Sequence, residues 1–271
     1  MYFLDATLPS LEENLALDEA LLDAAEGGRA GAVLRVWEWS GLAVVVGRAS
    51  RVTEEVLPEK CRLLGIPILR RCSGGAAVVI GPGCWMYSLI LPLSAEMPRQ
   101  PDRIHAAVLD PIAAALAARV PGVVRAGISD LARDAAFADD APRTSADPAH
   151  TSTGVPLASA DDSRDPRPAP RKFSGNSLRC RRAWLLYHGT MLYDFDLSLV
   201  GELLAMPPRR PDYRGSRDHA DFLCNLPLDR PALCHLMRTV WNAWEPLPDP
   251  PLAEWQRLLP RYRDPQWHWE R

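Results

Sequence analysis

Apolar residues recur along the chain with two spacings, one typical of helices and the other of strands. Positions 104, 108, 112 and 116 are apolar, and this four-residue spacing predicts an amphipathic helix over 102–119. A capping box formed by Ser10 and Glu13 predicts the start of another helix, over 10–25. Further helices are predicted at 54–64, 197–204 and 230–244, and apolar or β-branched runs predict strands at 33–37, 42–46, 66–71, 76–80, 85–91, 123–127 and 183–193, the last interrupted at His188-Gly189.

The strands dominate the middle of the chain, and they alternate irregularly with the helices instead of forming repeated βαβ units. This order predicts an α/β fold of the α+β type, with a central mixed β-sheet flanked by helices. Residues 138–170 contain almost no large apolar side chain, so we expect a disordered insertion there. We expect one catalytic domain over 1–245, followed by a short tail over 246–271 that is too small for an accessory domain.

Composition excludes several classes of protein. The net charge of −3 argues against general binding to nucleic acid or membranes. No apolar run approaches the ~20 residues that span a bilayer, and the N-terminus lacks the features of a signal peptide, so a cytoplasmic protein is expected. The six cysteines form no C-x-x-C pair, which argues against a zinc site or a redox pair. No permanent cofactor is expected.

Lysine is scarce, because only Lys60 and Lys172 occur among 31 basic residues. Lys60 falls in a helical pattern and is expected on the surface. Lys172 precedes a Ser-Gly-Asn turn that contains Gly175 and Asn176. A lysine in an arginine-rich chain is a candidate for a site that needs a compact ammonium group.

A second candidate segment is the glycine-rich run Arg70-Arg71-Cys72-Ser73-Gly74-Gly75. Two glycines between strands allow a ligand to approach the main chain closely, and the two arginines supply donors for carboxylate or phosphate oxygens. The alternative interpretation is an ordinary hairpin with solvated arginines.

These segments, in their order along residues 10–226, resemble the lipoate–protein ligase A family, within the biotin/lipoate ligase and octanoyltransferase superfamily. The sequence departs from the family pattern at Ala76, which replaces a third glycine, and at Ile80, Met86 and Ser129, which replace polar residues. The resemblance is carried by residues 14–20, 44–48, 70–75, 78–83, 127–131, 172–176, 188–190 and 207–226.

The resemblance implies a biotin/lipoate ligase-like catalytic domain and a two-step reaction. ATP, with Mg²⁺, and lipoate or a related medium-chain acid such as octanoate would form an acyl-adenylate. The acyl group would then pass to a lysine of a lipoyl domain of a 2-oxoacid dehydrogenase or of the glycine cleavage H protein. A separate accessory protein is a further possible partner.

The resemblance also implies roles for individual residues. Lys172 would stabilise the charge that develops during adenylation and transfer. Asp130 would hold Mg²⁺ or the nucleotide. Val78 would line an apolar tunnel, and Trp37 would either close one side of it or belong to the core. The residues expected to bind the substrate or adenylate are Arg70, Arg71, Ser73, Gly74, Gly75, Ala76, Val78, Gly175, Asn176, His188, Gly189 and Trp37.

Two other functions stay open. An octanoyltransferase would take the acyl group from a carrier protein through a cysteine thioester, and Cys72 and Cys180 have the cationic neighbours that lower a thiol pKa. In one such group the cysteine shortly precedes the lysine motif, where this chain has Asp130-Leu131-Ala132. A non-catalytic protein that retains the acyl pocket is the third reading. The arginines at 179–182 are expected to receive an acidic carrier domain.

Overall fold

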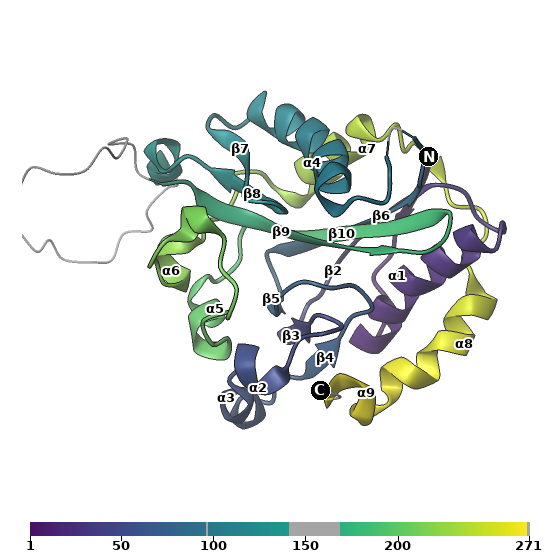
Figure 1. Cartoon of the computed structure of the whole chain (residues 1–271), viewed down its shortest axis with the longest axis horizontal. Coiled ribbons are helices and arrows are strands. Elements are labelled where there is room, and N and C mark those ends of the chain that lie inside the picture. Colours follow the sequence, from purple (N-terminus) through teal and green to yellow (C-terminus); the bar gives the residue numbers. More distant parts are fainter. Residues whose placement is uncertain (96, 141–168, 270–271) are drawn as a thin grey trace, which may run out of the picture.

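The structure is a computed structural model, and it describes residues 1–95, 97–140 and 169–269 (Figure 1). The insertion predicted at 138–170 falls almost wholly on residues that lie outside this description.

A large mixed sheet runs through the middle of the molecule (Figure 1). Among the described residues it has eight strands, in the order β11-β1-β2-β6-β10-β9-β8-β7. The strands β1 and β2 pair in parallel, whereas β2, β6, β10, β9, β8 and β7 pair antiparallel in turn. Their bounds are β1 Tyr2–Asp5, β2 Val33–Glu38, β6 Cys84–Pro92, β7 Val123–Ala126, β8 Asp130–Arg133, β9 Arg171–Cys180, β10 Trp184–Leu192 and β11 Glu245–Pro246.

A small three-stranded sheet lies below the large one in Figure 1. Its central strand is β3 (Ala43–Val46), flanked by β4 (Ile68–Arg70) in parallel and by β5 (Val78–Ile80) antiparallel. The glycine-rich segment connects β4 to β5, so it has to cross the end of β3. The two strands therefore do not form the hairpin that their spacing suggests.

Helices cover both faces of the large sheet (Figure 1). On one face, α4 and α7 pack over a core that includes Trp85 and Tyr87 of β6. On the other, α1 and the small sheet pack over residues such as Trp37 and Met86. The helices are α1 Leu11–Glu26, α2 Val52–Glu55, α3 Pro58–Leu63, α4 Pro101–Ala117, α5 Ser198–Leu203, α6 His219–Phe222, α7 Arg230–Val240, α8 Leu252–Arg263 and α9 Pro265–Trp269, with 3-10 turns η1 Ala135–Asp140 and η2 Asp212–Arg214.

The sequence predictions hold for most elements. The capping box at the start of α1 is present in full, since the Ser10 side chain accepts from the Glu13 amide and the Glu13 carboxylate accepts from the Ser10 amide. The helix predicted over 54–64 divides in two, and α3 begins at Pro58, where proline removes an amide donor. The interruption predicted at His188-Gly189 is wrong, because β10 is continuous through both residues.

Residues 246–269 are part of the same fold. The helix α8 packs against α1 (Figure 1), and the Tyr262 hydroxyl donates to the Glu19 carboxylate of α1 over 2.7 Å. The Trp255 indole also donates to the Glu13 carbonyl. The sequence analysis assigned no helix to this tail, although Leu258, Leu259 and Tyr262 follow a helical spacing on its buried side.

Candidate functional site

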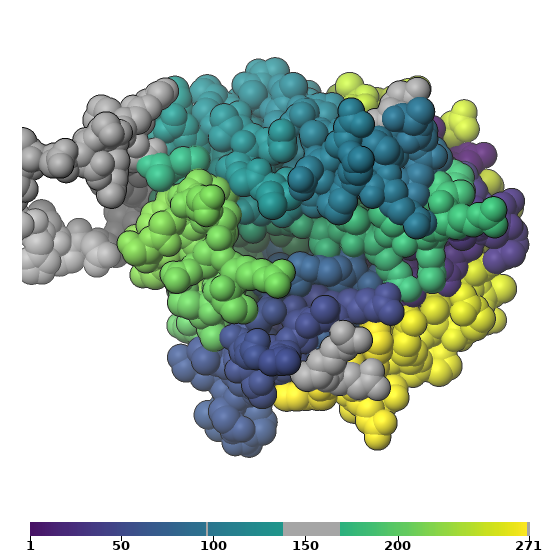
Figure 2. Space-filling model, in the orientation of Figure 1, coloured from purple at the N-terminus to yellow at the C-terminus, as the bar shows by residue number. Residues whose placement is uncertain are grey.

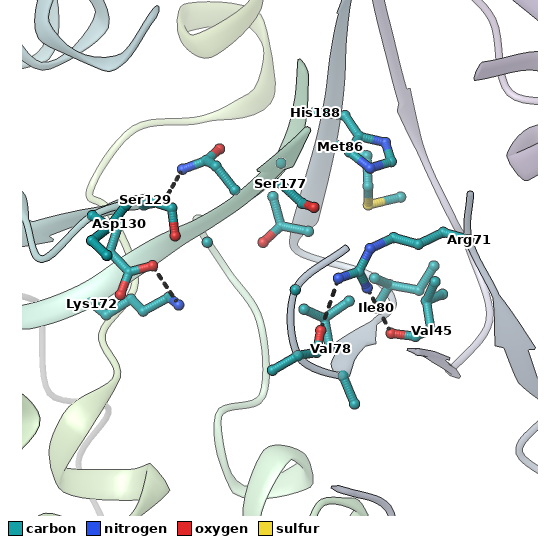
Figure 3. Close-up of a pocket in the computed structure, with 18 of the residues that line it drawn as sticks. Val45, Arg71, Val78, Ile80, Met86, Ser129, Asp130, Lys172, Ser177 and His188 are labelled. Atoms are coloured by element: carbon teal, nitrogen blue, oxygen red, sulfur yellow. Dashed lines mark hydrogen bonds and ion pairs between the residues drawn. The ribbon is translucent and has the colours of Figure 1, made fainter. Parts of the chain in front are cut away.

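Lys172 and the glycine-rich segment line the same cavity, which has a volume of about 690 Å³. Figure 3 shows Lys172 and Asp130 on one side of it and Arg71, Ile80 and Val45 on the other. The molecular surface is hollowed between the segment that carries α5 and α6 and the small sheet (Figure 2). The predicted residues that line the cavity are Trp37, Arg71, Gly75, Ala76, Val78, Asp130, Lys172, Gly175, Asn176, His188 and Gly189.

The ammonium group of Lys172 is held by Asp130 across two neighbouring strands. Lys172 Nζ lies 2.8 Å from Asp130 Oδ1, and the other oxygen of Asp130 accepts a 2.8 Å hydrogen bond from the Tyr213 hydroxyl. Burial and the adjacent Asp130 carboxylate raise the pKa of Tyr213, so its hydroxyl stays a neutral donor. A Cβ on Gly175 would lie 2.8 Å from Nζ, so glycine leaves the space that the lysine occupies. Asp130 and Gly175 therefore fix where the ammonium group points.

Asn176 lies on β9, as Lys172 does, and lines the cavity. Three hydrogen bonds hold its side chain. Its carbonyl oxygen accepts from the Tyr87 hydroxyl over 2.6 Å, and its amide donates to the Ser129 carbonyl over 2.8 Å and to the Ser174 hydroxyl over 3.2 Å. Gly189 lies directly opposite Asn176 on β10 and leaves room for this side chain. Asn176 thus links β9 to β6 and to the turn that precedes β8.

The glycine-rich segment is closely packed against the turn after β3. A Cβ on Gly47 would lie 2.0 Å from the Gly75 carbonyl oxygen, and the Ser50 hydroxyl donates to that same oxygen. Gly75 itself has a φ of 82°, which is strained for any other residue. Two glycines, Gly47 and Gly75, are therefore required by the backbone geometry of the segment.

Arg71 holds this segment from inside. Its guanidinium donates to the Val45 carbonyl over 3.0 Å, the Ala76 carbonyl over 2.9 Å and the Gly74 carbonyl over 2.5 Å. Burial lowers the pKa of Arg71 to about 10, opposed by the nearby Glu55 carboxylate, so it is still charged at neutral pH. Arg71 lines the cavity, but most of its donors are engaged by the protein.

Arg70 is placed away from the cavity, contrary to the expectation that it faces an anionic ligand. Its side chain is buried and donates to the carbonyls of Gly47, Ser50, Trp267 and His268. It therefore joins the turn after β3 to the C-terminal helix α9. The physical reason is the alternation of a strand, which directs Arg70 and Arg71 to opposite sides.

Ser73 and Gly74 were also predicted to contact the substrate, yet neither lines the cavity. Ser73 is buried, and its hydroxyl lies 2.5 Å from Nε2 of His188 and accepts from Nε of Arg71 over 3.1 Å. Nδ1 of His188 lies 3.2 Å from the Asp18 carboxylate. Since Arg71 donates to Ser73, the hydroxyl proton is left for Nε2, and Nδ1–H donates to Asp18. A continuous polar chain thus connects the glycine-rich segment to α1.

Asp18 is a cavity residue to which the sequence analysis gave no role. It is buried, forms a 2.6 Å ion pair with Arg35 and accepts from the Ser88 hydroxyl over 2.7 Å. Burial alone would raise the pKa of Asp18, but Arg35 and His188 outweigh it and lower the pKa. The signal in the sequence was an acidic residue within the apolar run of the first helix.

The remaining wall is largely apolar. Trp37 lines the cavity as well as belonging to the core, so both interpretations of it hold. The departures from the family pattern at Ile80 and Met86 place apolar side chains on this wall (Figure 3). Such a lining suits an aliphatic chain. The apolar lining residues are Leu15, Trp37, Val45, Ala76, Ala77, Val78, Ile80 and Met86.

A second cavity, of about 160 Å³, adjoins the first. Lys172, Ala76, Val78 and Thr190 line both cavities, so Lys172 stands where they meet. The second cavity is also mainly apolar, and Nε2 of its wall residue His219 is buried without a hydrogen-bond partner among the described residues.

None of the six cysteines, all of which the structure describes, lines either cavity. Cys72 is buried in a core cluster, and burial raises its pKa to about 12 despite the nearby Arg179. Burial also raises the pKa of Cys180. The cationic neighbours that the sequence suggested for these thiols therefore do not activate them.

Those cationic neighbours form internal ion pairs instead. Arg179 and Arg181 both pair with the buried Glu19, and Arg181 also pairs with Asp23 over 2.5 Å. This cluster fastens the β9–β10 hairpin to α1. Arg182 is exposed and forms no ion pair with a described residue, so only part of the arginine cluster predicted at 179–182 is neutralised internally.

Asp130 does not belong to a preformed metal site. Within residues 1–95, 97–140 and 169–269 no group of three His, Cys, Asp or Glu side chains is placed to hold a metal ion. Both oxygens of Asp130 are engaged, by Lys172 and Tyr213. In the described part of the chain, no helix is both long and apolar enough to cross a membrane.

Most of the chain is similar in sequence to one known protein family. The sequence profile of the lipoyl protein ligase A/B catalytic domain matches residues 10–227. The octanoyltransferase LipM of Geobacillus kaustophilus is 27% identical over 76% of this chain and 69% of its own length. That of Exiguobacterium sibiricum is 37% identical over 31% of this chain and only 30% of its own length.

The fold is shared with a solved structure of an archaeal lipoylation system. That structure contains a bi-partite lipoate protein ligase and its E2 lipoyl domain from Thermoplasma acidophilum. The match covers 99% of this chain and 95% of the other, with a TM-score of 0.73 and 16% sequence identity. At this identity the likeness concerns the fold alone.

Proposed function

This chain belongs to the lipoyl protein ligase A/B catalytic-domain family, and we propose that it attaches lipoate or a related medium-chain acyl group to a lysine of a lipoyl domain through an acyl-adenylate. One observation carries the proposal. The ammonium group of Lys172 stands where an apolar cavity suited to an acyl chain meets a second cavity, and no thiol lies in either.

In the first step the carboxylate of the acid attacks the α-phosphorus of ATP, the acyl–phosphate bond forms, and pyrophosphate leaves. Negative charge gathers on the α-phosphate oxygens. Lys172 stabilises it with a cation that Asp130 already holds in place, so little reorganisation is needed. The acyl chain occupies the larger cavity and the adenosine the second. Mg²⁺ would enter with the triphosphate as part of the substrate, and Asp130, which lines the larger cavity, would be a carboxylate available to it.

In the second step the carrier lysine attacks the acyl carbon, the amide bond forms, and AMP leaves with the bonding electron pair. Lys172 again faces the oxygen on which charge develops. The incoming lysine must lose a proton, and water at the open mouth of the cavity accepts it. Asn176, fixed by Tyr87 and Ser129, keeps the wall beside Lys172 rigid.

The similarity to LipM proteins favours a second candidate, an octanoyltransferase that receives the acyl group from a carrier protein. As formulated from the sequence, that reaction passes through a cysteine thioester. Burial raises the pKa of both Cys72 and Cys84 to about 12, and neither lines a cavity. This absence of a placed thiol puts the ligase ahead of the transferase.

One experiment separates the candidates. The protein is incubated with an apo lipoyl domain and either lipoate plus ATP or an octanoyl-carrier protein, and the lipoyl domain is weighed by mass spectrometry. The ligase requires modification that depends on ATP and that releases pyrophosphate. Transfer of octanoyl from the carrier protein to the lipoyl domain without ATP would show that the protein is a transferase and not a ligase. Ligand binding without modification of the lipoyl domain would support a binding protein.

Lys172→Ala tests the assignment of the catalytic residue. Lys60→Ala is the matched control, because Lys60 is the other lysine of the chain and lies exposed on α3. We expect Lys172→Ala to lose modification by about a hundredfold or more while Lys60→Ala keeps it. Full activity of Lys172→Ala, with an unchanged melting temperature, contradicts the proposal.

A further inference from the structure

Two adjacent arginines, Arg209 and Arg210, stand at the mouth of the cavities. Both line the larger cavity, and Arg209 lines the second as well. Both are exposed, and neither makes a hydrogen bond or ion pair with any described residue. They differ in this from Arg70 and Arg71, whose donors are taken up by backbone carbonyls.

The segment that carries these arginines is held firmly against the site. Prolines at 207, 208 and 211 restrict its backbone before and after the pair. Tyr213 anchors it to Asp130, and the side chains of Pro211 and Tyr213 lie against Gly127, at 3.4 and 3.2 Å from where a Cβ would stand. The arginines therefore project from a fixed base close to Lys172.

Positive charge accumulates here, and no described carboxylate forms an ion pair with Arg209 or Arg210. Burial lowers the pKa of Arg214, and Arg210 and Arg217 lower it further, which shows that like charges are close together. The acidic residues nearby are engaged or make no pair with the arginines. Asp130 holds Lys172, and Glu55 accepts from the Ala77 amide over 2.6 Å. Asp212 lines the larger cavity but forms no ion pair with a described residue.

We propose that Arg209 and Arg210 form a phosphoryl-binding site that takes the pyrophosphate portion of ATP beside Lys172. Planar guanidinium groups bind phosphate oxygens in pairs, and two such groups suit a group with several charges. The choice of ATP as the source of the phosphoryl group rests on the proposed function. The phosphodiester of an acyl-phosphopantetheine on a carrier protein has the same chemistry and would reach the same mouth.

The test measures the dissociation constant of inorganic pyrophosphate by calorimetry. The variants are Arg209→Ala/Arg210→Ala and Arg209→Lys/Arg210→Lys, and the control is Arg119→Ala, an exposed arginine that follows α4 on the far face of the sheet. We expect the double alanine variant to weaken pyrophosphate binding by about tenfold or more, the double lysine variant to weaken it less, and lipoate binding to stay within about twofold. Measurable pyrophosphate binding with the same dissociation constant in the wild-type protein and the double alanine variant overturns the inference.

A second arm separates this inference from the proposed function. If the wild-type protein lipoylates the domain with ATP, and the double alanine variant does so with an unchanged KM for ATP, the arginine site is refuted and the ligase function is supported. If pyrophosphate does not bind, but octanoyl-carrier binds and loses affinity in the double alanine variant, the phosphoryl site stands and the ligase falls. If neither probe depends on the two arginines, the site is refuted.

Discussion

Gly189 and Asn176 face each other across β10 and β9, and a Cβ on Gly189 would lie 1.8 Å from Oδ1 of Asn176. The absence of a side chain at Gly189 thus leaves room for the Asn176 side chain, which lines the larger cavity. Hydrogen bonds to Tyr87 and Ser129 hold the Asn176 side chain in this position, so it cannot move away without breaking them.

Gly189→Ala is therefore expected to destabilise the protein by about 2 to 3 kcal/mol, through a clash with Asn176. Gly201→Ala is the control, since Gly201 lies exposed in α5 with ample space around it. Alanine in a helix is expected to stabilise by about 0.5 to 1 kcal/mol. Urea unfolding of both variants measures the difference, and equal stabilities would show that the Asn176 position is not constrained.

The buried Asp18 makes stability depend on pH in the acid range. Arg35 and His188 hold its folded pKa below the ordinary value of 3.8. A carboxylate with a depressed pKa contributes stability that is full above the unfolded value and is lost as the pH falls through the folded value.

Asp18→Asn should accordingly lower the free energy of unfolding by about 3 kcal/mol at pH 7, because Arg35 stays buried without its charge partner. The difference in unfolding free energy between variant and wild type should narrow as the pH falls below 3.8, because the unfolded carboxylate then binds a proton that the folded one, with its lower pKa, still resists. Denaturant titrations from pH 7 downward check this, and a gap that stays constant with pH speaks against the ion pair as its cause.

Asp130→Asn tests whether the carboxylate positions the Lys172 ammonium group that we propose to be catalytic. Loss of the 2.8 Å ion pair lets the Lys172 amine shift, and we expect turnover to fall by about tenfold to a hundredfold with little change in lipoate affinity. Tyr213→Phe, which removes only the second partner of Asp130, should have a smaller effect.

A matched control for this pair is Asp110→Asn, which removes an exposed ion pair with Arg125. It should leave turnover unchanged, since such pairs contribute about 0 to 1 kcal/mol. A loss of turnover in Asp110→Asn equal to that in Asp130→Asn would indicate a general effect of charge instead of positioning.

The cysteines are expected to be inert towards alkylation in the native protein. The thiolate is the reactive form, and burial raises the pKa of Cys72 and Cys84 to about 12 and that of Cys224 to about 11. Acyl transfer should survive treatment with iodoacetamide at pH 7.5, and Cys72→Ser should remain active. If iodoacetamide labels one cysteine stoichiometrically and acyl transfer is lost with it, the result would support a thioester mechanism.

Local patterns in the sequence were sufficient for much of the fold and for the central residue of the site. The capping box started α1 where expected, because its hydrogen bonds lie within four residues. The scarcity of lysine singled out Lys172, which does line the cavity with Gly75. By contrast, the sequence analysis did not assign the helix α8, although Leu258, Leu259 and Tyr262 carry a helical spacing, and its contact with α1 is a tertiary one.

The sequence by itself determined many of the helices and strands, the resemblance of the chain to its family, and the isolation of one lysine among many arginines. Only the tertiary structure decided which cations face the cavity. The side chains of Arg70 and Arg71 donate to backbone carbonyls inside the protein. Asp18 of the first helix lines the cavity, and Arg209 and Arg210 lie at its mouth. The reason is physical: a side chain's partners depend on the direction in which its strand or turn points it, and that direction follows from contacts with residues far away in the sequence.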